Sequence, residues 1–198
     1  MILKIGITGG IGSGKSVISH LLRLMHVPIY DCDAEAKRLV VENSDIRRQL
    51  ACLVGENLYD DSGLDKQLLA SYIFNDQTHL QAVNGIIHPA VKSDFYEWTK
   101  IQAKQFSIVG MESAILIDAG FKNAVDLVVN VSAPIEIRIQ RAVLRDHSSV
   151  ELIKKRIDKQ MSDEERCKLS DITIWNDDVH PIIPQVFSFL CQLKQNNK

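Results

Sequence analysis

The residues with the clearest chemical pattern are Gly9-Gly10-Ile11-Gly12-Ser13-Gly14-Lys15-Ser16, which follow a short apolar run. In the pattern G-x-x-x-x-G-K-[ST], the glycines let the backbone curl so that successive N–H groups point at phosphate oxygens. Lys15 can reach the β- and γ-phosphates, Ser16 can ligate Mg²⁺, and a helix that begins here adds its positive dipole end. We expect a triphosphate site, because the complete motif is hard to explain as a turn that merely joins a strand to a helix.

A second group with catalytic potential is the carboxylate pair Asp31 and Asp33, which follows the short apolar run 28–30. A kinase needs a group that orients the acceptor hydroxyl and takes its proton, and a carboxylate beside the phosphate loop suits that task. Alternate residues of an extended segment face the same way, so the pair would converge while Cys32 points toward the core. The alternative is that Asp33 simply N-caps a helix beginning at Ala34.

The elements that must position these residues are predicted from apolar runs and helical spacing. Residues 15–25 have a helical pattern, and the predicted strands are 2–8, 28–30, 107–111, 126–131 and 171–175. Five strands separated by helices indicate a five-stranded parallel sheet. Because parallel strands need crossovers with helices on both faces, we expect an α/β three-layer sandwich with ligands at the carboxyl edge of the sheet.

Two segments are expected to be inserted into one domain that spans residues 1–198. Residues 39–100 show helical patterns, with loops predicted at 60–63 and 88–89, and form a helical subdomain. Residues 141–166 are rich in charge and poor in aromatic residues, which favours a mobile helical lid. The core is then made of residues 1–38, 101–140 and 167–198.

The composition excludes several classes of protein. The 198 residues are 45% hydrophobic with a net charge of -2, so no general attraction for nucleic acid or anionic lipid is expected. No apolar run approaches the roughly 20 residues of a membrane span. The four cysteines are scattered, without the spacing of a zinc site or a disulfide framework. We expect a cytoplasmic protein with no signal peptide, no membrane or nucleic-acid partner and no obligate protein partner.

Nearly end to end, the chain resembles the dephospho-coenzyme A kinase family. The most specific piece is the Thr-Gly-Gly-Ile start of the phosphate loop at residues 8–11. Further matches are Asp31-Cys32-Asp33 with Ala36 and Arg38, Ile73-Phe74, Asn84 with His88-Pro89, residues 112–120, Arg156 with Gln160, and Asp171 with Asn176. The chain departs from the family at Glu112, Ala114 and Asp118, where Asp, Pro and Glu are usual.

The resemblance implies a P-loop kinase that uses ATP and Mg²⁺ to phosphorylate the ribose 3'-hydroxyl of dephospho-coenzyme A, giving coenzyme A and ADP. The phosphate-loop motif, the carboxylate pair and the spacing of the arginines, taken with this resemblance, give Lys15, Asp33 and Arg141 as the expected catalytic residues and Ser16 as the expected metal ligand. The expected nucleotide-binding residues, from the motif, the arginine spacing and the resemblance together, are Gly9, Gly10, Ile11, Gly12, Ser13, Gly14, Lys15, Ser16, Val17, Arg145 and Asn176. The implied acceptor-binding residues are Thr8, Asp31, Asp33, Arg38 and His88.

Some assignments stay open on the sequence. Arg138, Arg141 and Arg145 recur at helical spacing, and such like charges repel unless an anion such as phosphate lies between them; a solvated basic face is the alternative. Leu68, Tyr72 and Ile87 either line a groove for the pantetheine arm or pack helices together. The other functions considered are a nucleoside or nucleoside-monophosphate kinase and a nucleotide-dependent switch.

Overall fold

The computed structural model describes residues 2–61, 63–74 and 76–196. The chain divides into two compact units, and each is described here by itself. The first unit contains Met1–Tyr30 and Thr99–Lys198, and the second contains Asp31–Trp98.

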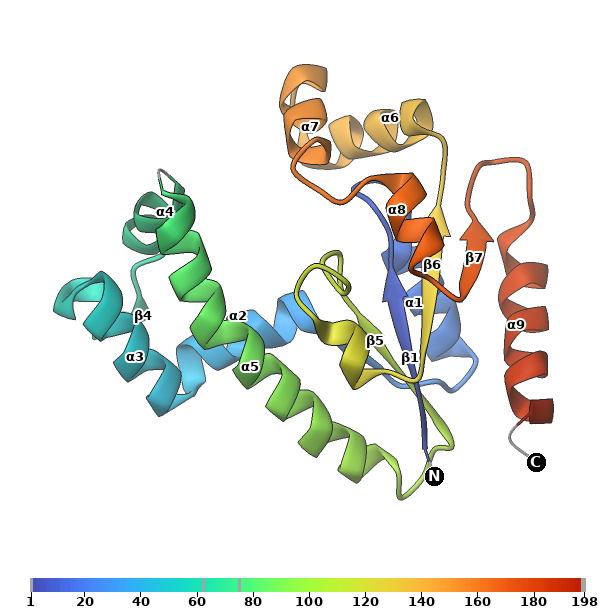
Figure 1. Ribbon diagram of the computed structural model, residues 1–198, viewed down its shortest axis with the longest axis horizontal. Helices are drawn as coiled ribbons and strands as arrows, with labels where there is room; N and C mark the ends of the chain where they lie inside the picture. Colours follow the sequence, from blue (N-terminus) through green and yellow to red (C-terminus); the bar gives the residue numbers. More distant parts are fainter. Residues whose placement is uncertain (1, 62, 75, 197–198) are drawn as a thin grey trace. The chain divides into compact units, whose positions relative to one another are not determined.

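The first unit is built on a sheet with the strand order β2-β5-β1-β6-β7 (Figure 1). The strands are β1 (Leu3–Thr8), β2 (Ile29–Asp31), β5 (Ile108–Glu112), β6 (Leu127–Ser132) and β7 (Ile172–Trp175). The central strand β1 pairs in parallel with β5 and β6, so that Ile7 lies opposite Glu112 and Val129. All five predicted strands are present, and the predicted three-layer parallel α/β fold is confirmed.

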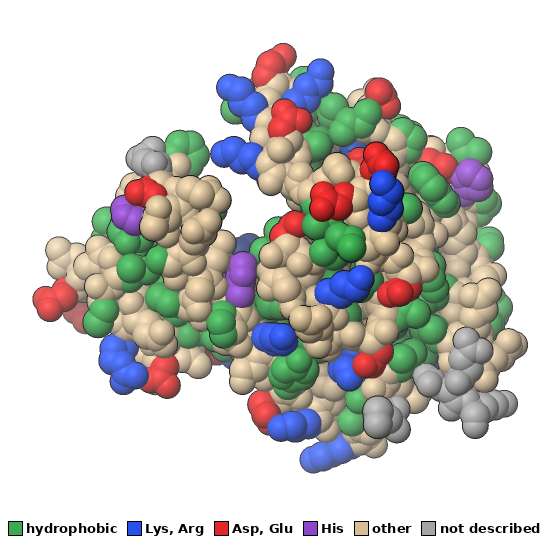
Figure 2. Space-filling model, in the orientation of Figure 1, with side chains coloured by type: hydrophobic (Ala, Val, Ile, Leu, Met, Phe, Trp, Pro, Cys, Tyr) green, Lys and Arg blue, Asp and Glu red, His purple; other side chains and the backbone are tan. Residues whose placement is uncertain are grey.

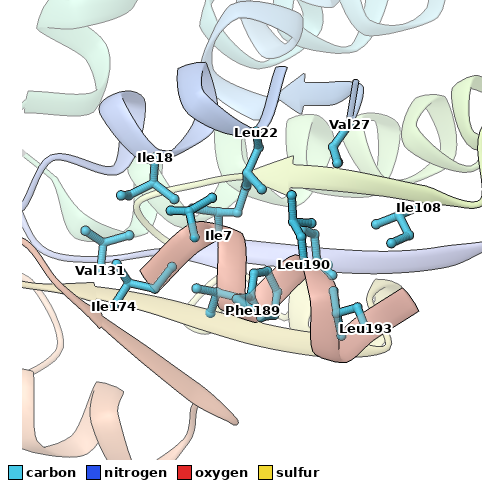
Figure 3. Close-up of a cluster of buried hydrophobic side chains, with 13 residues drawn as sticks. Ile7, Ile18, Leu22, Val27, Ile108, Val131, Ile174, Phe189, Leu190 and Leu193 are labelled. Carbon is cyan, nitrogen blue, oxygen red and sulfur yellow. The ribbon is translucent and has the colours of Figure 1, made fainter. Parts of the chain in front are cut away.

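The two faces of the sheet are covered differently because successive residues of β1 point to opposite faces. Ile7 faces helices α1 (Lys15–Leu24) and α9 (Ile182–Asn196), and Figure 3 shows Ile18, Leu22 and Leu190 gathered around it. Gly6 faces the other side, where an added Cβ would lie 2.8 Å from Leu116. Burying each such apolar side chain contributes about 1.5–3 kcal/mol, which holds the strand ends in fixed positions.

The predicted lid begins within α6 (Ile135–Asp146) and continues through α7 (Val150–Ile157) and α8 (Asp163–Lys168). Basic side chains lie over α7 in Figure 2, and its last turn contains Lys154, Lys155 and Arg156. By contrast, Arg166 in α8 is buried, with 2% of its surface exposed. The two ends of this segment therefore differ in their exposure to solvent.

The second unit is mainly helical, as predicted, with two local differences. Its elements are α2 (Cys32–Glu42), α3 (Ser44–Val54), η1 (Glu56–Leu58), β3 (Tyr59–Asp60), β4 (Gly63–Leu64), α4 (Lys66–Phe74) and α5 (Gln77–Gln102). The strands β3 and β4 form a short antiparallel pair where a loop was predicted. The loop predicted at 88–89 is wrong, because Pro89 lies inside α5 and interrupts only one backbone hydrogen bond of a 26-residue helix.

Among the described residues, no helix combines the length and hydropathy that a membrane span requires. The cysteines Cys32, Cys52, Cys167 and Cys191 are all free thiols.

Candidate active site

The phosphate loop connects β1 to α1 in the way the motif predicts. Within it, the Ser13 N–H donates to the Gly10 carbonyl at 3.1 Å. Gly14 is the N-cap of α1 with φ 92° and ψ 28°, a left-handed conformation that strains residues with a side chain. Its carbonyl accepts from the N–H groups of Val17 and Ile18, and these bonds start the helix. The loop therefore ends at a helix N-terminus, the ordinary binding position for phosphate.

Three residues expected to act on the nucleotide lie in the first turn of α1. Lys15 is half-buried, whereas Ser16 and Val17 are exposed. No acidic residue is present in this first turn, so no side chain there offsets the positive end of the helix dipole. The exposed hydroxyl of Ser16 can approach a metal ion that also binds nucleotide phosphates.

Asn176 follows β7, and its side chain holds the backbone of the phosphate loop. Its Nδ2 donates to the Ser13 carbonyl at 2.8 Å, and its own N–H donates to the Ser132 carbonyl at the end of β6. A Cβ added to Gly14 would overlap the Asn176 amide. The sequence predicted Asn176 as a nucleotide-binding residue, and the structure brings it to the loop, where its side-chain amide donates to the Ser13 backbone.

Two predicted arginines of α6 have carboxylate partners of their own. Arg141 donates to the Asn176 carbonyl at 2.9 Å and to Asp178 at 2.6 Å. Arg145 and Arg156 both donate to Asp146 at 2.7 Å. These two hydrogen bonds lower the pKa of Asp146 to about 2, and the bond from Arg145 has the larger effect. The helical spacing of the arginines therefore does not require a bound phosphate between them.

Arg138 is a residue of this site whose role the sequence reasoning missed. Only 1% of its surface is exposed, its Nε donates to the Ile11 carbonyl at 2.9 Å, and its Nη1 pairs with Asp163. Burial lowers its pKa, and the charge of Asp163 opposes that shift. Helical spacing put Arg138 on the same helix as Arg141, but nothing in the sequence indicated its contact with a loop 127 residues earlier.

Of the two carboxylates, Asp31 and not Asp33 caps the helix. Oδ1 of Asp31 accepts from the N–H groups of Asp33 and Ala34, both at 3.0 Å. Helix α2 begins at Cys32, so both the alternative in which Asp33 is the cap and the extended path predicted for residues 31–33 are wrong. The prediction that Cys32 is buried is confirmed, with 4% exposed. Asp33 lies in the first turn of α2 and is not needed as its cap.

The remaining predicted acceptor residues occupy varied surroundings. Arg38 pairs with Glu35 at 2.5 Å, Asp94 at 2.9 Å and Glu42 at 3.3 Å, and these carboxylates raise its pKa. His88 is half-buried in α5, and burial lowers its pKa. Thr8, at the end of β1, has 1% of its surface exposed.

The second unit contains an apolar cavity of about 450 Å³. Its lining residues are Ala36, Lys37, Val40, Val41, Leu64, Lys66, Leu69 and Ile87. Of the three groove residues predicted from the sequence, Ile87 lines this cavity. The ring of Tyr72 instead stacks on His79 with the ring centroids 3.9 Å apart.

Comparison with known proteins gives a consistent picture. The family model described as dephospho-CoA kinase matches residues 3–181. A dephospho-CoA kinase of Bacteroides fragilis (strain YCH46) is 51% identical over 195 residues, which cover 98% of this chain and 95% of the relative. A second, from Porphyromonas gingivalis, is 42% identical over 93% of this chain and 91% of the relative. The solved structure of a dephospho-CoA kinase from Campylobacter jejuni shares the fold, with a TM-score of 0.73, 21% identity and 100% of both chains covered.

Proposed function

The chain belongs to the dephospho-CoA kinase family, and from this premise we propose which of its residues carry out the reaction. The family model and the relatives confirm the family predicted from the sequence. This family catalyses the last step of coenzyme A synthesis, the ATP-dependent phosphorylation of the 3'-hydroxyl of dephospho-coenzyme A. The observation that carries the residue assignment is the complete phosphate loop, closed by the hydrogen bond from Asn176 to Ser13.

Residues 9–17 bind the triphosphate in this proposal. The loop N–H groups and the N-terminus of α1 receive phosphate oxygens, and Lys15 contacts the β- and γ-phosphates. Mg²⁺ usually keeps several waters and binds through few protein ligands plus substrate phosphates, and the exposed Ser16 hydroxyl fits that ligand set. No cluster of three His, Cys, Asp or Glu side chains suited to a metal occurs in the described part of the chain. When bound with ATP, Mg²⁺ neutralises charge on the β- and γ-phosphates.

Asp33 orients the acceptor hydroxyl and takes its proton. Its position supports this role, because it follows the carboxyl end of β2 by two residues, at the edge of the sheet where parallel α/β folds bind ligands. Since Asp31 caps α2, the Asp33 carboxylate is not committed to that structural task. The proton leaves the 3'-oxygen for the Asp33 carboxylate as that oxygen forms its bond to the γ-phosphorus and the bond to ADP breaks.

Arg141 and Arg145 stabilise the charge on the transferring group. Arg141 is suited to this because its present partner, Asp178, has 69% of its side chain exposed and is therefore weakly held. A phosphate oxygen can replace Asp178 while the bond to the Asn176 carbonyl keeps the guanidinium in place.

Other parts of the proposal rest on the family pattern. Residues 39–100 bind the acceptor, residues 141–166 act as the lid, and Thr8, Asp31, Arg38 and His88 contribute to acceptor binding. For Arg38 this requires the exchange of at least one carboxylate partner for a substrate phosphate. We place the reaction in the cytoplasm, where ATP is available and free thiols such as Cys52 and Cys167 stay reduced.

The experiment that tests the function is an acceptor-dependence assay. Purified protein with ATP and Mg²⁺ should release ADP rapidly only when dephospho-coenzyme A is added, and the product should carry the new phosphate on the 3'-oxygen. Faster release with ribonucleosides or nucleoside monophosphates would support the alternative kinases, and turnover without any acceptor would support the switch.

A further inference from the structure

A charged cluster of two buried arginines and one exposed aspartate lies directly against the phosphate loop. It contains Arg138 of α6 together with Asp163 and Arg166 of α8. Asp163 bonds Nη1 of Arg138 through one oxygen and Nη1 of Arg166 through the other. The arginine side chains have 1% and 3% of their surface exposed. Two guanidinium groups and one carboxylate leave this cluster with a net charge of +1.

The cluster and its neighbour Gln160 hold the peptide groups of one loop residue from both directions. The Ile11 carbonyl accepts from Nε of Arg138 at 2.9 Å, and the Ile11 N–H donates to Oε1 of Gln160, also at 2.9 Å. Ile11 lies in the middle of the glycine-rich turn, which has few side chains of its own to hold its shape. The fixed orientation of its peptide groups therefore depends on residues outside the motif.

Arg138 also explains two glycines of the loop. Gly10 is not among the glycines with positive φ, yet a Cβ there would overlap the Arg138 guanidinium. A Cβ on Gly12 would overlap the backbone carbonyl of Arg138. Nη2 of Arg138 is buried and has no hydrogen-bond partner among the described residues. Leaving a charged donor unpaired is costly, and the bonds of the same guanidinium to the Ile11 carbonyl and to Asp163 oppose that cost.

We propose that Arg138 is a positioning residue for phosphoryl transfer, which holds Ile11 so that the phosphate loop is preformed for the triphosphate of ATP. Asp163, itself held by Arg166, fixes the Arg138 guanidinium, and Gln160 fixes the Ile11 N–H. Arg138 acts through the loop backbone and not on the phosphates. The inference rests on the proposed function only in that the loop binds ATP. Because a flexible loop must be ordered on binding, loss of this support weakens ATP binding.

The test measures ATP dissociation constants by calorimetry, which needs no acceptor, and KM values for ATP and for dephospho-coenzyme A. Arg138→Met removes the bond to Ile11 and should weaken ATP binding by about 10- to 100-fold, the equivalent of one strong hydrogen bond from a charged donor. KM for dephospho-coenzyme A should change little. Arg138→Lys should rescue poorly, since an ammonium group lacks the planar fork that serves Ile11 and Asp163 together.

Asp163→Asn separates positioning from simple electrostatic attraction. This change makes the cluster more positive, so an electrostatic role predicts tighter ATP binding. Positioning predicts weaker binding, since a neutral amide holds two guanidinium groups poorly. Gln160→Ala, a milder change outside the charged cluster, keeps the test possible if the other variants do not fold, and it should also weaken ATP binding.

Two control variants match the perturbations. Lys168→Met removes the same unit of charge from an exposed ion pair on α8, and Val186→Ala destabilises the core within α9. Neither should change ATP affinity at temperatures well below melting. Unchanged ATP affinity in folded Arg138→Met or Gln160→Ala, tighter binding in Asp163→Asn, or equal losses in the controls would each overturn the proposal. Failure of wild type to use dephospho-coenzyme A would refute the proposed function and leave the ATP measurements valid.

Discussion

The change Asp33→Asn tests the proposed base most directly, because the structure separates the two carboxylates by role. The N-cap of α2 is Asp31, which accepts two backbone hydrogen bonds at 3.0 Å. Asp33→Asn leaves both bonds intact, so the melting temperature should stay within about 1 °C of wild type. The amide keeps the shape of the carboxylate but cannot take the proton of the 3'-hydroxyl.

The expected loss of activity follows from the size of general-base contributions. These are about 100- to 10,000-fold, so turnover should fall by that factor, equivalent to roughly 3–5.5 kcal/mol in the barrier. ATP affinity should be unchanged, because residues 9–17 are untouched. Steady-state rates, calorimetry with ATP and thermal melting on the same preparations give the three quantities.

Asp31→Ala is the matched control for the structural role. Loss of this cap should cost about 1 kcal/mol of unfolding free energy, which corresponds to roughly 2–4 °C in melting temperature for a chain of this size. Asp31→Asn should restore the stability, since asparagine caps a helix about as well as aspartate. Wild-type turnover in Asp33→Asn would refute the base assignment and direct attention to Asp31. A large drop in the melting temperature of Asp33→Asn would contradict the assignment of Asp31 as the cap of α2.

Four further changes test other parts of the site. Lys15→Ala should lower turnover by at least about 100-fold, the scale of one strong transition-state contact, and near-normal turnover would end the phosphate-loop assignment. Arg141→Ala should reduce turnover more than ATP affinity, measured by kinetics and calorimetry; full turnover would place Arg141 outside the mechanism. Gly14→Ala should weaken ATP binding by strain and by overlap with Asn176, and the loss should shrink in Asn176→Ala, whereas simple additivity would contradict the overlap. Because burial lowers the pKa of His88, the unfolded chain takes up its proton more readily, so stability should fall as pH drops below about 6.5. His88→Gln should flatten that part of the melting curve against pH, and an unchanged slope would refute the assignment.

The sequence was enough to predict the phosphate loop and the sheet. Both depend on local patterns: residues 9–16 carry their own spacing, and the five strands are short apolar runs bounded by loops or helices. The apolar strands bury side chains on both faces, which is the signature of a parallel sheet. Local pattern also predicted the helical character of residues 39–100, although it misplaced a break at Pro89, since a long helix tolerates one missing hydrogen bond.

The roles of neighbouring polar residues were not readable from the sequence. Asp31 and Asp33 are the same residue type two positions apart, and which one caps α2 depends on whether the helix begins at Cys32 or Ala34. Element boundaries are set by packing as much as by propensity, so a shift of two residues moved the cap from one carboxylate to the other.

The support of the phosphate loop was decided by tertiary structure alone. The bond from Asn176 to Ser13 joins residues 163 positions apart. Arg138 and Gln160 bond Ile11 from positions far along the chain, and Asp163 in turn pairs with Arg138. Backbone carbonyls and N–H groups look the same at every position of a sequence, so no residue type marks which of them a distant side chain will bind. The sequence determined that a phosphate loop exists because its glycines and Lys15 are chemically distinctive. Only the fold determined what holds that loop in shape, because burial and long-range contact make an ordinary arginine part of it.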